Sequence, residues 1–281
     1  MNVRLMKDQD LVSACALSAA EGWNQTEMDW RFLFSGKQNV CLVAEEDGRI
    51  TGTATALVHP PGLAWIGMVL VDKGMRGKGI GRMLMSDIIN RLDYFESVKL
   101  DATPAGLPLY RNLGFIEEYN LYRMTNTAFS GIPESGSGFA EKIDKTNIEY
   151  VLQSDRKIFG SDRSMLLRYL LDNNPGNAFA VFNSGKTEAY ILGRAGVKYS
   201  YIGPACGATP DTVKRIIEGV LLSNSGKSMA LDIPEDKHGI IRWLESNGFQ
   251  IQRSFTRMYL KSNKYPGETE CQYLISGPEF G

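Results

Sequence analysis

Three glycines alternate with other residues in the segment "RGKGIG" at 76–81. Gly77, Gly79 and Gly81 permit a sharp turn and leave successive backbone N–H groups uncovered by side chains. Apolar residues recur at helical spacing from Ile80 onward, so these groups would join the unpaired amides at a helix N-terminus. Such a loop suits a phosphate or a pyrophosphate, although glycines alone could equally serve a plain turn between a strand and a helix.

Two arginines, Arg76 and Arg82, flank the glycines and could add charge-assisted hydrogen bonds to phosphate oxygens. Two familiar phosphate-binding loops do not fit this segment. A Walker loop requires Ser or Thr after its Gly-Lys pair, but Gly79 follows Lys78. A Rossmann loop begins directly at the end of a strand, whereas the residues "DKGM" separate Val71 from Arg76.

The elements around the glycine loop alternate between strands and helices, which predicts a mixed α/β fold. Asp47-Gly48 marks a hairpin turn, "HPPG" marks a second turn, and Gly114 ends a short helix. In chain order, the expected elements are a strand at 3–6, a helix from 11, two strands within 39–62, a strand at 63–71, a helix with apolar positions from 80 to 95, a strand at 98–103, a short helix within 106–114 and a strand at 115–124.

The length of the chain suits two domains of ordinary size. Residues 126–139 are rich in Gly, Ser, Thr and Pro and lose the hydrophobic periodicity, which predicts a linker between a domain at 1–125 and a domain at 140–281. The second half contains weak echoes of the first, such as "LDIP" for "LDAT" and "SNGF" for "NLGF". It is shorter where the first half has its glycine loop. We therefore expect a duplication without that loop, although short coincidences of this kind are common.

Charge and composition limit the partners that we expect. The chain has 31 basic and 32 acidic residues, so no global field would hold it on nucleic acid or a membrane. Four separated cysteines and two histidines make a disulfide framework or a zinc site improbable. No stretch has the pattern of a signal peptide or a transmembrane helix, so we expect a soluble cytoplasmic protein that binds no metal.

Two motifs carry a resemblance to a known family. "VLVDKGMRGKGIGRML" resembles the acetyl-CoA signature of the GNAT superfamily of N-acetyltransferases, with Arg76, Gly79 and Gly81 in the three defining positions. Lys73 departs from the family pattern, which frequently has proline there. "AGLPLYRNLGF" at 105–115 resembles the second signature of the superfamily, Ala-x-x-x-Leu-Tyr-x-x-x-Gly-Phe. The chain is identified as a two-domain member with an intact first domain and a degenerate second domain.

The resemblance implies the fold and the position of a cosubstrate, acetyl-CoA. Each domain is expected to hold a mixed, mostly antiparallel twisted sheet flanked by helices. Acetyl-CoA would lie where the fourth and fifth strands separate, and its pantetheine arm would pair with main-chain groups of a strand. The cofactor-binding residues are then Val69, Leu70 and Val71 on the strand and Arg76, Gly77, Lys78, Gly79, Ile80, Gly81 and Arg82 in the loop. The valine side chains themselves can be plain core, and we expect at most one competent cofactor site.

Tyr110 matches the family position of a general acid. Transfer of acetyl to an amine by direct attack requires a neutral amine, a polarised carbonyl and a proton for the departing thiolate. A phenol, with an ordinary pKa of ~10, stays protonated at neutral pH and can donate to a thiolate, whose thiol has an ordinary pKa of ~8.5. The alternative is a half-buried tyrosine that packs and bonds to water.

The general base and the acceptor pocket stay open at this stage. Trp23 and Trp30 in "GWNQTEMDW" could wall a pocket or could belong to the core. Four ionisable residues border the expected acceptor side, and each could equally be a solvated surface group; these are Glu21, Glu27, Asp29 and His59.

The leading hypothesis is an N-acetyltransferase that transfers acetyl from acetyl-CoA to a primary amine of a small molecule. Two alternatives are an acyl-CoA sensor without turnover and a tandem-domain transferase that acts on a peptide or protein amine. A long charged groove would favour the latter. The acceptor, the acyl chain length, the oligomeric state and any ligand of the second domain are not defined by the sequence.

Overall fold

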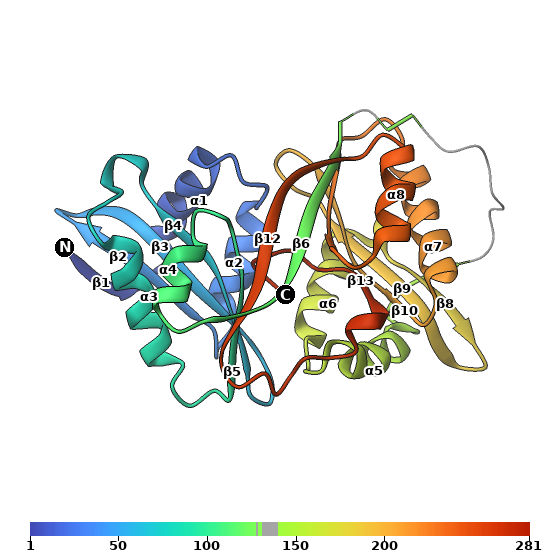
Figure 1. Ribbon diagram of the computed structural model, residues 1–281, viewed down its shortest axis with the longest axis horizontal. Coiled ribbons are helices and arrows are strands. Elements are labelled where there is room, and N and C mark those ends of the chain that lie inside the picture. Colours follow the sequence, from blue (N-terminus) through green and yellow to red (C-terminus); the bar gives the residue numbers. More distant parts are fainter. Residues whose placement is uncertain (128, 131–139) are drawn as a thin grey trace. The chain divides into compact units, whose positions relative to one another are not determined.

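A computed structural model describes residues 1–127, 129–130 and 140–281 (Figure 1). The described residues form two compact units, and neither unit is one continuous stretch of chain. The first unit comprises Met1–Glu117, Met258–Lys264 and Pro278–Phe280, and the second comprises Glu118–Arg257, Tyr265–Gly277 and Gly281. Most of the expected linker lies outside the described residues, and the boundary at 126–139 stays a prediction. Two late segments of the chain complete the first unit, which no local sequence pattern indicates.

The sheet of the first unit follows the chain order. Its strands are β1 (Asn2–Leu5), β2 (Val40–Glu46), β3 (Arg49–His59), β4 (Leu63–Val71), β5 (Ser97–Ala102) and the last residues of β12 (Gln250–Lys261). The first four strands are antiparallel, and β5 runs parallel to β4. Asp47 and Gly48 have φ of 51° and 77° at the turn between β2 and β3. This left-handed pair gives the tight hairpin that the Asp-Gly sequence predicts.

The helices of the first unit are α1 (Leu11–Ala20), α2 (Glu27–Ser35), α3 (Ile80–Arg91) and α4 (Leu107–Asn112). The apolar side of α3 packs on one face of the sheet, where Leu84 joins a core with Ala64 and Ile66 of β4. The apolar spacing of the sequence continues to Phe95, but α3 ends at Arg91. Phe95 is buried in the turn that follows, so the spacing indicates burial there and not helix.

The sheet of the second unit has the order β12, β6 (Ile116–Asn126), β11 (Met229–Pro234), β10 (Ser200–Gly207), β9 (Lys186–Arg194), β8 (Phe179–Asn183) and β7 (Glu141–Lys142), and β13 (Gln272–Leu274) pairs with β10. Its helices are α5 (Ile148–Phe159), α6 (Ser164–Asn173), α7 (Pro210–Ser223) and α8 (His238–Ser246). Short 3-10 helices lie at Asp8–Asp10, Lys73–Met75, Pro175–Asn177 and Thr269–Cys271.

The two units repeat one order of elements. In the first, an antiparallel strand pair is followed by α3, a parallel strand, α4 and a further strand, and in the second the same order runs through α7 and α8 (Figure 1). This repetition confirms the expected tandem α/β fold with a mostly antiparallel sheet. Across the described part of the chain, every helix is too short or too polar to cross a lipid bilayer.

Candidate functional site

Strands β4 and β5 of the first unit pair along part of their length. The parallel register runs from Leu63 opposite Ser97 to Trp65 opposite Lys99. Within the described residues, β4 continues to Val71 without a β5 partner beyond Trp65. The main-chain edge of β4 is therefore available there to an extended ligand, which could pair with it as an added strand.

A bulge in β4 lies where the two strands separate. Met68 has φ of 49°, and the register against β3 shifts between Thr53 opposite Leu70 and Thr55 opposite Gly67. The hydroxyl of Thr53 donates to the Met68 carbonyl at 2.8 Å, and that of Thr55 donates to the Gly67 carbonyl at 3.1 Å. Bulges commonly lie next to active sites and redirect nearby groups. Neither threonine was singled out from the sequence, because a methionine rarely marks a bulge.

The strand residues expected to contact the cosubstrate have the surroundings that their residue types imply. Leu70 is buried, while Val69 and Val71 are half-buried and pack against the core that α3 covers. Their side chains are therefore core groups. Any contact of these residues with a ligand would be made by their main-chain N–H and C=O groups.

The loop after β4 is shaped by its own hydrogen bonds and by two left-handed glycines. The Asp72 carboxylate accepts from the Gly74 amide at 2.9 Å and from the Arg49 guanidinium at 2.6 Å. Gly77 and Gly79 have φ of 79° and 81°. A Cβ on either glycine would have no atom within 4 Å. The glycines are thus required by backbone conformation, and the space above them is open.

Helix α3 begins directly after this loop without a side-chain cap. Its N-cap is Gly79, so no side chain there accepts from the first amides of the helix. A Cβ on Gly81 would lie an ordinary 3.5 Å from the Leu109 side chain. Leading amides of α3 can therefore donate to a bound anion, helped by the positive end of the helix dipole. Loop and helix together fit a pyrophosphate group such as that of acetyl-CoA.

The basic side chains around the loop are of two kinds. Arg76 ion-pairs with Glu21 and donates through Nε to the Val71 carbonyl at 3.3 Å, so it fastens the loop to the residue after α1. The sequence predicts a direct contact between Arg76 and the phosphate, and this stays a prediction; its guanidinium pairs with Glu21 in this structure. Lys78 and Arg82 are exposed at the glycine loop and on the first turn of α3. These two cations are the better candidates for contact with a bound anion.

Tyr110 lies on α4 and is 8% exposed. Its ring packs edge-on against Phe115, and a Cβ on Gly106 would come within 2.8 Å of the Tyr110 ring. Gly106 therefore makes room for the phenol. Burial raises the pKa of Tyr110 to about 12, because the apolar surroundings disfavour the phenolate. The side chain is accordingly a proton donor throughout the neutral range.

The four ionisable residues considered as bases all have structural partners. Glu21 pairs with Arg76, and Glu27 pairs with Arg31 at 2.7 Å on the surface of α2. Asp29 accepts from the Thr26 amide at 2.7 Å in the capping box of α2, and His59 Nε2 contacts the Phe280 carbonyl at 2.9 Å. These contacts favour structural roles for all four.

The two tryptophans of α2 and the preceding loop differ in burial. Trp30 is fully buried, and its indole N–H donates to the Ser18 hydroxyl at 3.1 Å. Trp30 is therefore a core residue, which is the second of the two alternatives that the sequence leaves open. Trp23 is half-buried and still suits the wall of an acceptor pocket.

The corresponding strands of the second unit also separate, but a segment of the same chain lies between them. The pairing of β10 and β11 covers Ser200 and Tyr201, and farther along β10 its Ala205 pairs with Leu274 of β13. The amide of Ile275 then donates to the Asp232 carbonyl of β11 at 3.0 Å. The segment at Leu274 and Ile275 thus occupies the edge of β10 that corresponds to the open edge of β4 in the first unit.

The helix that corresponds to α3 differs from it in having a side-chain cap. Helix α7 begins at Pro210, and its N-cap Thr209 accepts from the Thr212 amide at 3.3 Å. No glycine loop precedes it. The second unit therefore has neither the open strand edge nor the uncapped glycine turn.

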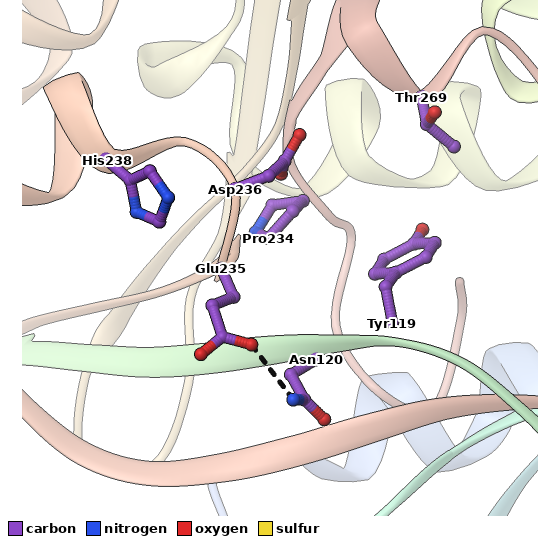
Figure 2. A pocket seen from close by; sticks show the side chains of 7 residues that line it. All are labelled: Tyr119, Asn120, Pro234, Glu235, Asp236, His238 and Thr269. Carbon is purple, nitrogen blue, oxygen red and sulfur yellow. Dashed lines mark hydrogen bonds between the residues drawn. The ribbon is translucent and has the colours of Figure 1, made fainter.

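A hollow of about 520 Å³ opens on the second unit (Figure 2). It is lined by Tyr119, Asn120, Pro234, Glu235, Asp236, His238 and Thr269. Glu235 accepts from the Tyr122 hydroxyl and, at 2.9 Å, from the Asn120 side-chain amide, and these bonds lower the pKa of its carboxyl. The Glu235 carboxylate is therefore already engaged by neighbours within the second unit.

Comparison with known families identifies the class of protein. Two models described as acetyltransferase (GNAT) domains match residues 37–117 and 151–274, one in each half of the chain. The chain belongs to the GNAT family, as a two-domain acyltransferase. Both halves thus derive from the same kind of domain, although the site described above lies in the first unit.

Individual relatives agree with this class. An uncharacterized N-acetyltransferase, YitH of Bacillus subtilis, is 26% identical over 187 residues, which are 66% of each chain. Holothin acyltransferase of a Pseudoalteromonas species is 28% identical over 223 residues, which are 78% of this chain and 73% of the relative. The crystal structure of a putative acetyltransferase from Pyrococcus horikoshii has a TM-score of 0.83 at 20% identity and covers 100% of this chain and 95% of that one. This last likeness concerns the fold of the whole chain.

Proposed function

We propose that the first unit transfers an acetyl group from acetyl-CoA to the primary amine of a small molecule by direct attack. The observation that carries this proposal is the combination, in one unit, of an open β4 edge, an uncapped α3 behind left-handed glycines, and a buried, protonated Tyr110. A strand-like pantetheine arm and a pyrophosphate need the first two features. A leaving thiolate needs the third.

The cosubstrate is held by main-chain groups in this proposal. The amides at Gly77–Gly81 receive the pyrophosphate, with Lys78 and Arg82 as nearby cations. The edge of β4 at Val69–Val71 receives the pantetheine arm. Arg76 contributes indirectly, because its ion pair with Glu21 fixes the loop.

Bound acetyl-CoA would supply a thioester for the amine to attack. Tyr110 donates its phenolic proton toward the sulfur as negative charge develops there. Because burial disfavours the phenolate, the proton is then readily taken back from the product side. The bulge at Met68 holds the β4 main chain in the orientation that the two threonines impose.

The second unit acts without a cosubstrate site of its own. Strand β13 and Ile275 form hydrogen bonds with the separated edges of β10 and β11, and Thr209 caps α7. This supports a degenerate domain with a structural role.

A small-molecule acceptor is supported by the names of relatives. These include holothin acyltransferase and, over shorter matches, acetyltransferases named for L-2,4-diaminobutyric acid and for glucosamine 6-phosphate. A half-buried Trp23 near the end of α1 offers an apolar wall of suitable size for such a compound.

The direct test is acetyl transfer by the purified chain to a panel of amines, comprising L-2,4-diaminobutyrate, glucosamine 6-phosphate, spermidine and a lysine-containing peptide. Release of the CoA thiol is followed with wild type and Tyr110→Phe. We expect turnover of a small amine, with kcat lowered by about 10²-fold or more in the variant and the Kd for acetyl-CoA nearly unchanged, because the lost donor acts in the transition state. Turnover of the peptide alone would contradict the small-molecule assignment. Binding of acetyl-CoA without any turnover would favour a sensor.

A further inference from the structure

The hollow of the second unit lies at a part of the fold that the proposed function does not use (Figure 2). One of its walls is the turn that leads from Pro234, the last residue of β11, to His238, the first residue of α8. The order of elements makes this turn the counterpart of residues 103–106, which lead from β5 to the helix that carries Tyr110. The hollow has a volume of about 520 Å³, within the ~300–1,000 Å³ that is usual for small-molecule pockets.

The side chains that line the hollow carry negative charge and no permanent positive charge. Glu235 and Asp236 are acidic, and the other lining residues include neither lysine nor arginine. Figure 2 shows His238 on one side of Glu235 and Tyr119 on the other. The lining therefore favours a cationic ligand over an anionic one.

The two carboxylates of the hollow differ in their partners. Asp236 forms an ion pair with Lys237 at 3.0 Å, so its charge is balanced within the turn. Glu235 accepts from the Tyr122 hydroxyl and from the Asn120 side-chain amide, which are neutral donors. These bonds hold the carboxylate in place and lower its pKa, so it is ionised at neutral pH. Within the described part of the chain, no lysine or arginine forms an ion pair with Glu235.

Glu235 can accept further hydrogen bonds in spite of these contacts. Its Oε1 receives one bond, from Tyr122, and its Oε2 receives one, from Asn120. A carboxylate offers about four acceptor sites, so about two remain for a ligand. An ammonium group has three N–H donors and a positive charge, and it matches these sites better than a neutral hydroxyl or amide does.

The same turn already holds one ammonium group, that of Lys237. Its Nζ donates to the Asp236 carboxylate at 3.0 Å and to the Thr269 carbonyl at 3.0 Å. It also lies 5.2 Å from the centre of the Tyr273 ring, and the lysine side chain is only 8% exposed. Asp236 is therefore committed to a lysine of the chain itself, and Glu235 is the carboxylate left for a ligand.

We propose that this hollow binds a small organic cation with a primary ammonium group, and that Glu235 receives the ammonium. The inference goes beyond the proposed function and does not depend on it, because every residue that it uses lies in the second unit. A metal ion is a poorer fit, because across the described residues no three His, Cys, Asp or Glu side chains are placed to hold one. Glu235 is half-buried, so water screens the ion pair and the binding is of modest strength.

The test is a calorimetric titration of the full chain with putrescine, a linear four-carbon diamine, and separately with the uncharged four-carbon diol of the same length. Wild type is compared with Glu235→Gln, which keeps the size of the side chain and removes its charge. Glu188→Gln is the matched control. Glu188 is also a half-buried glutamate of the second unit that accepts from a side-chain amide, that of Asn183 at 2.7 Å, but it does not line the hollow.

We expect putrescine to bind wild type and to bind Glu235→Gln about fivefold more weakly, with Glu188→Gln within about twofold of wild type. The diol should not bind. The Kd for acetyl-CoA should stay within about twofold in Glu235→Gln, because the proposed cosubstrate site lies in the first unit. Putrescine bound as an acceptor in the first unit would give a second component of the titration, which Glu235→Gln leaves unchanged.

Four results would overturn the inference. These are no binding of putrescine by wild type, equal binding of the diol, equal weakening by both variants, and a putrescine titration that Glu235→Gln leaves unchanged in every component. A matching loss of acetyl-CoA binding in Glu235→Gln would also overturn it, because the hollow would then not be a separate site. Absence of acetyl transfer by wild type would count against the proposed function alone.

Discussion

At the scale of single residues, the site depends on groups whose surroundings alter their chemistry. Tyr110 is the clearest case, because burial raises the pKa of its phenol to about 12 from an ordinary value of 10.0. The general-acid role that we propose for Tyr110 needs a proton that is present at neutral pH. An ordinary phenol already holds this proton at neutral pH, and burial extends the range over which Tyr110 holds it; Gly106 leaves space for the ring.

The raised pKa of Tyr110 predicts a specific loss of stability in alkali. Above pH 10 the unfolded chain releases the phenolic proton while the folded chain retains it until about pH 12, so the free energy of unfolding falls as pH rises. Relative to Tyr110→Phe, wild type should lose about 1 kcal/mol between pH 9 and pH 11. Urea denaturation of both proteins at the two pH values measures this difference. Parallel curves for the two proteins would show that the phenol titrates normally.

The sequence predicted some site residues better than others. The left-handed conformations of Gly77 and Gly79 follow from their residue type and from the helix that begins at Ile80. The orientation of Arg76 does not, because its partner Glu21 is distant in sequence. The close packing of Gly67 against Glu279 could not be predicted without the fold, because Gly67 looks like an ordinary strand glycine in the sequence.

At the scale of elements, the bulge of β4 is the feature on which the site depends. Thr53 and Thr55 of β3 hold the carbonyls of Met68 and Gly67 and so fix a backbone conformation that methionine rarely adopts. Most strands and helices were predictable from periodicity, including β4 at Leu63–Val71. The bulge was not, because its cause is a set of hydrogen bonds to the neighbouring strand.

Thr53→Val should loosen this bulge while preserving the shape of the side chain. Removal of the hydroxyl leaves the Met68 carbonyl without that donor, at a cost of about 1 to 2 kcal/mol in the free energy of unfolding. The KM for acetyl-CoA should rise several-fold, because the β4 edge shifts.

Thr51→Val is the matched control for this change. Thr51 is a buried threonine of the same strand, and its hydroxyl donates to the Ala44 carbonyl at 3.2 Å, away from the bulge. It should lower stability by a similar amount and leave the KM for acetyl-CoA unchanged. Equal effects of both variants on KM would mean that the bulge has no particular part in binding.

At the scale of the whole molecule, two units with the same order of elements differ at their separated strands. Both units repeat the same order of elements, and both have a parallel strand pair that separates. In the second unit, β13 pairs with β10, and the Ile275 amide donates to β11, where these two strands separate. The duplication itself was predictable from the echoes in the sequence. The pairing of Leu274 and Ile275 with β10 and β11 was not predictable, because that segment has no counterpart among the elements that the two units share.

The measurement that tests the central claim most directly is a calorimetric titration of the chain with acetyl-CoA, run on wild type, Gly79→Ala and Gly48→Ala. Both glycines have positive φ and open space around a Cβ, so the two variants carry similar backbone strain, but only Gly79 belongs to the loop. The account predicts one site per chain, weakened at least about tenfold by Gly79→Ala and unchanged by Gly48→Ala. Two sites per chain, no binding, or equal weakening by both variants would contradict it.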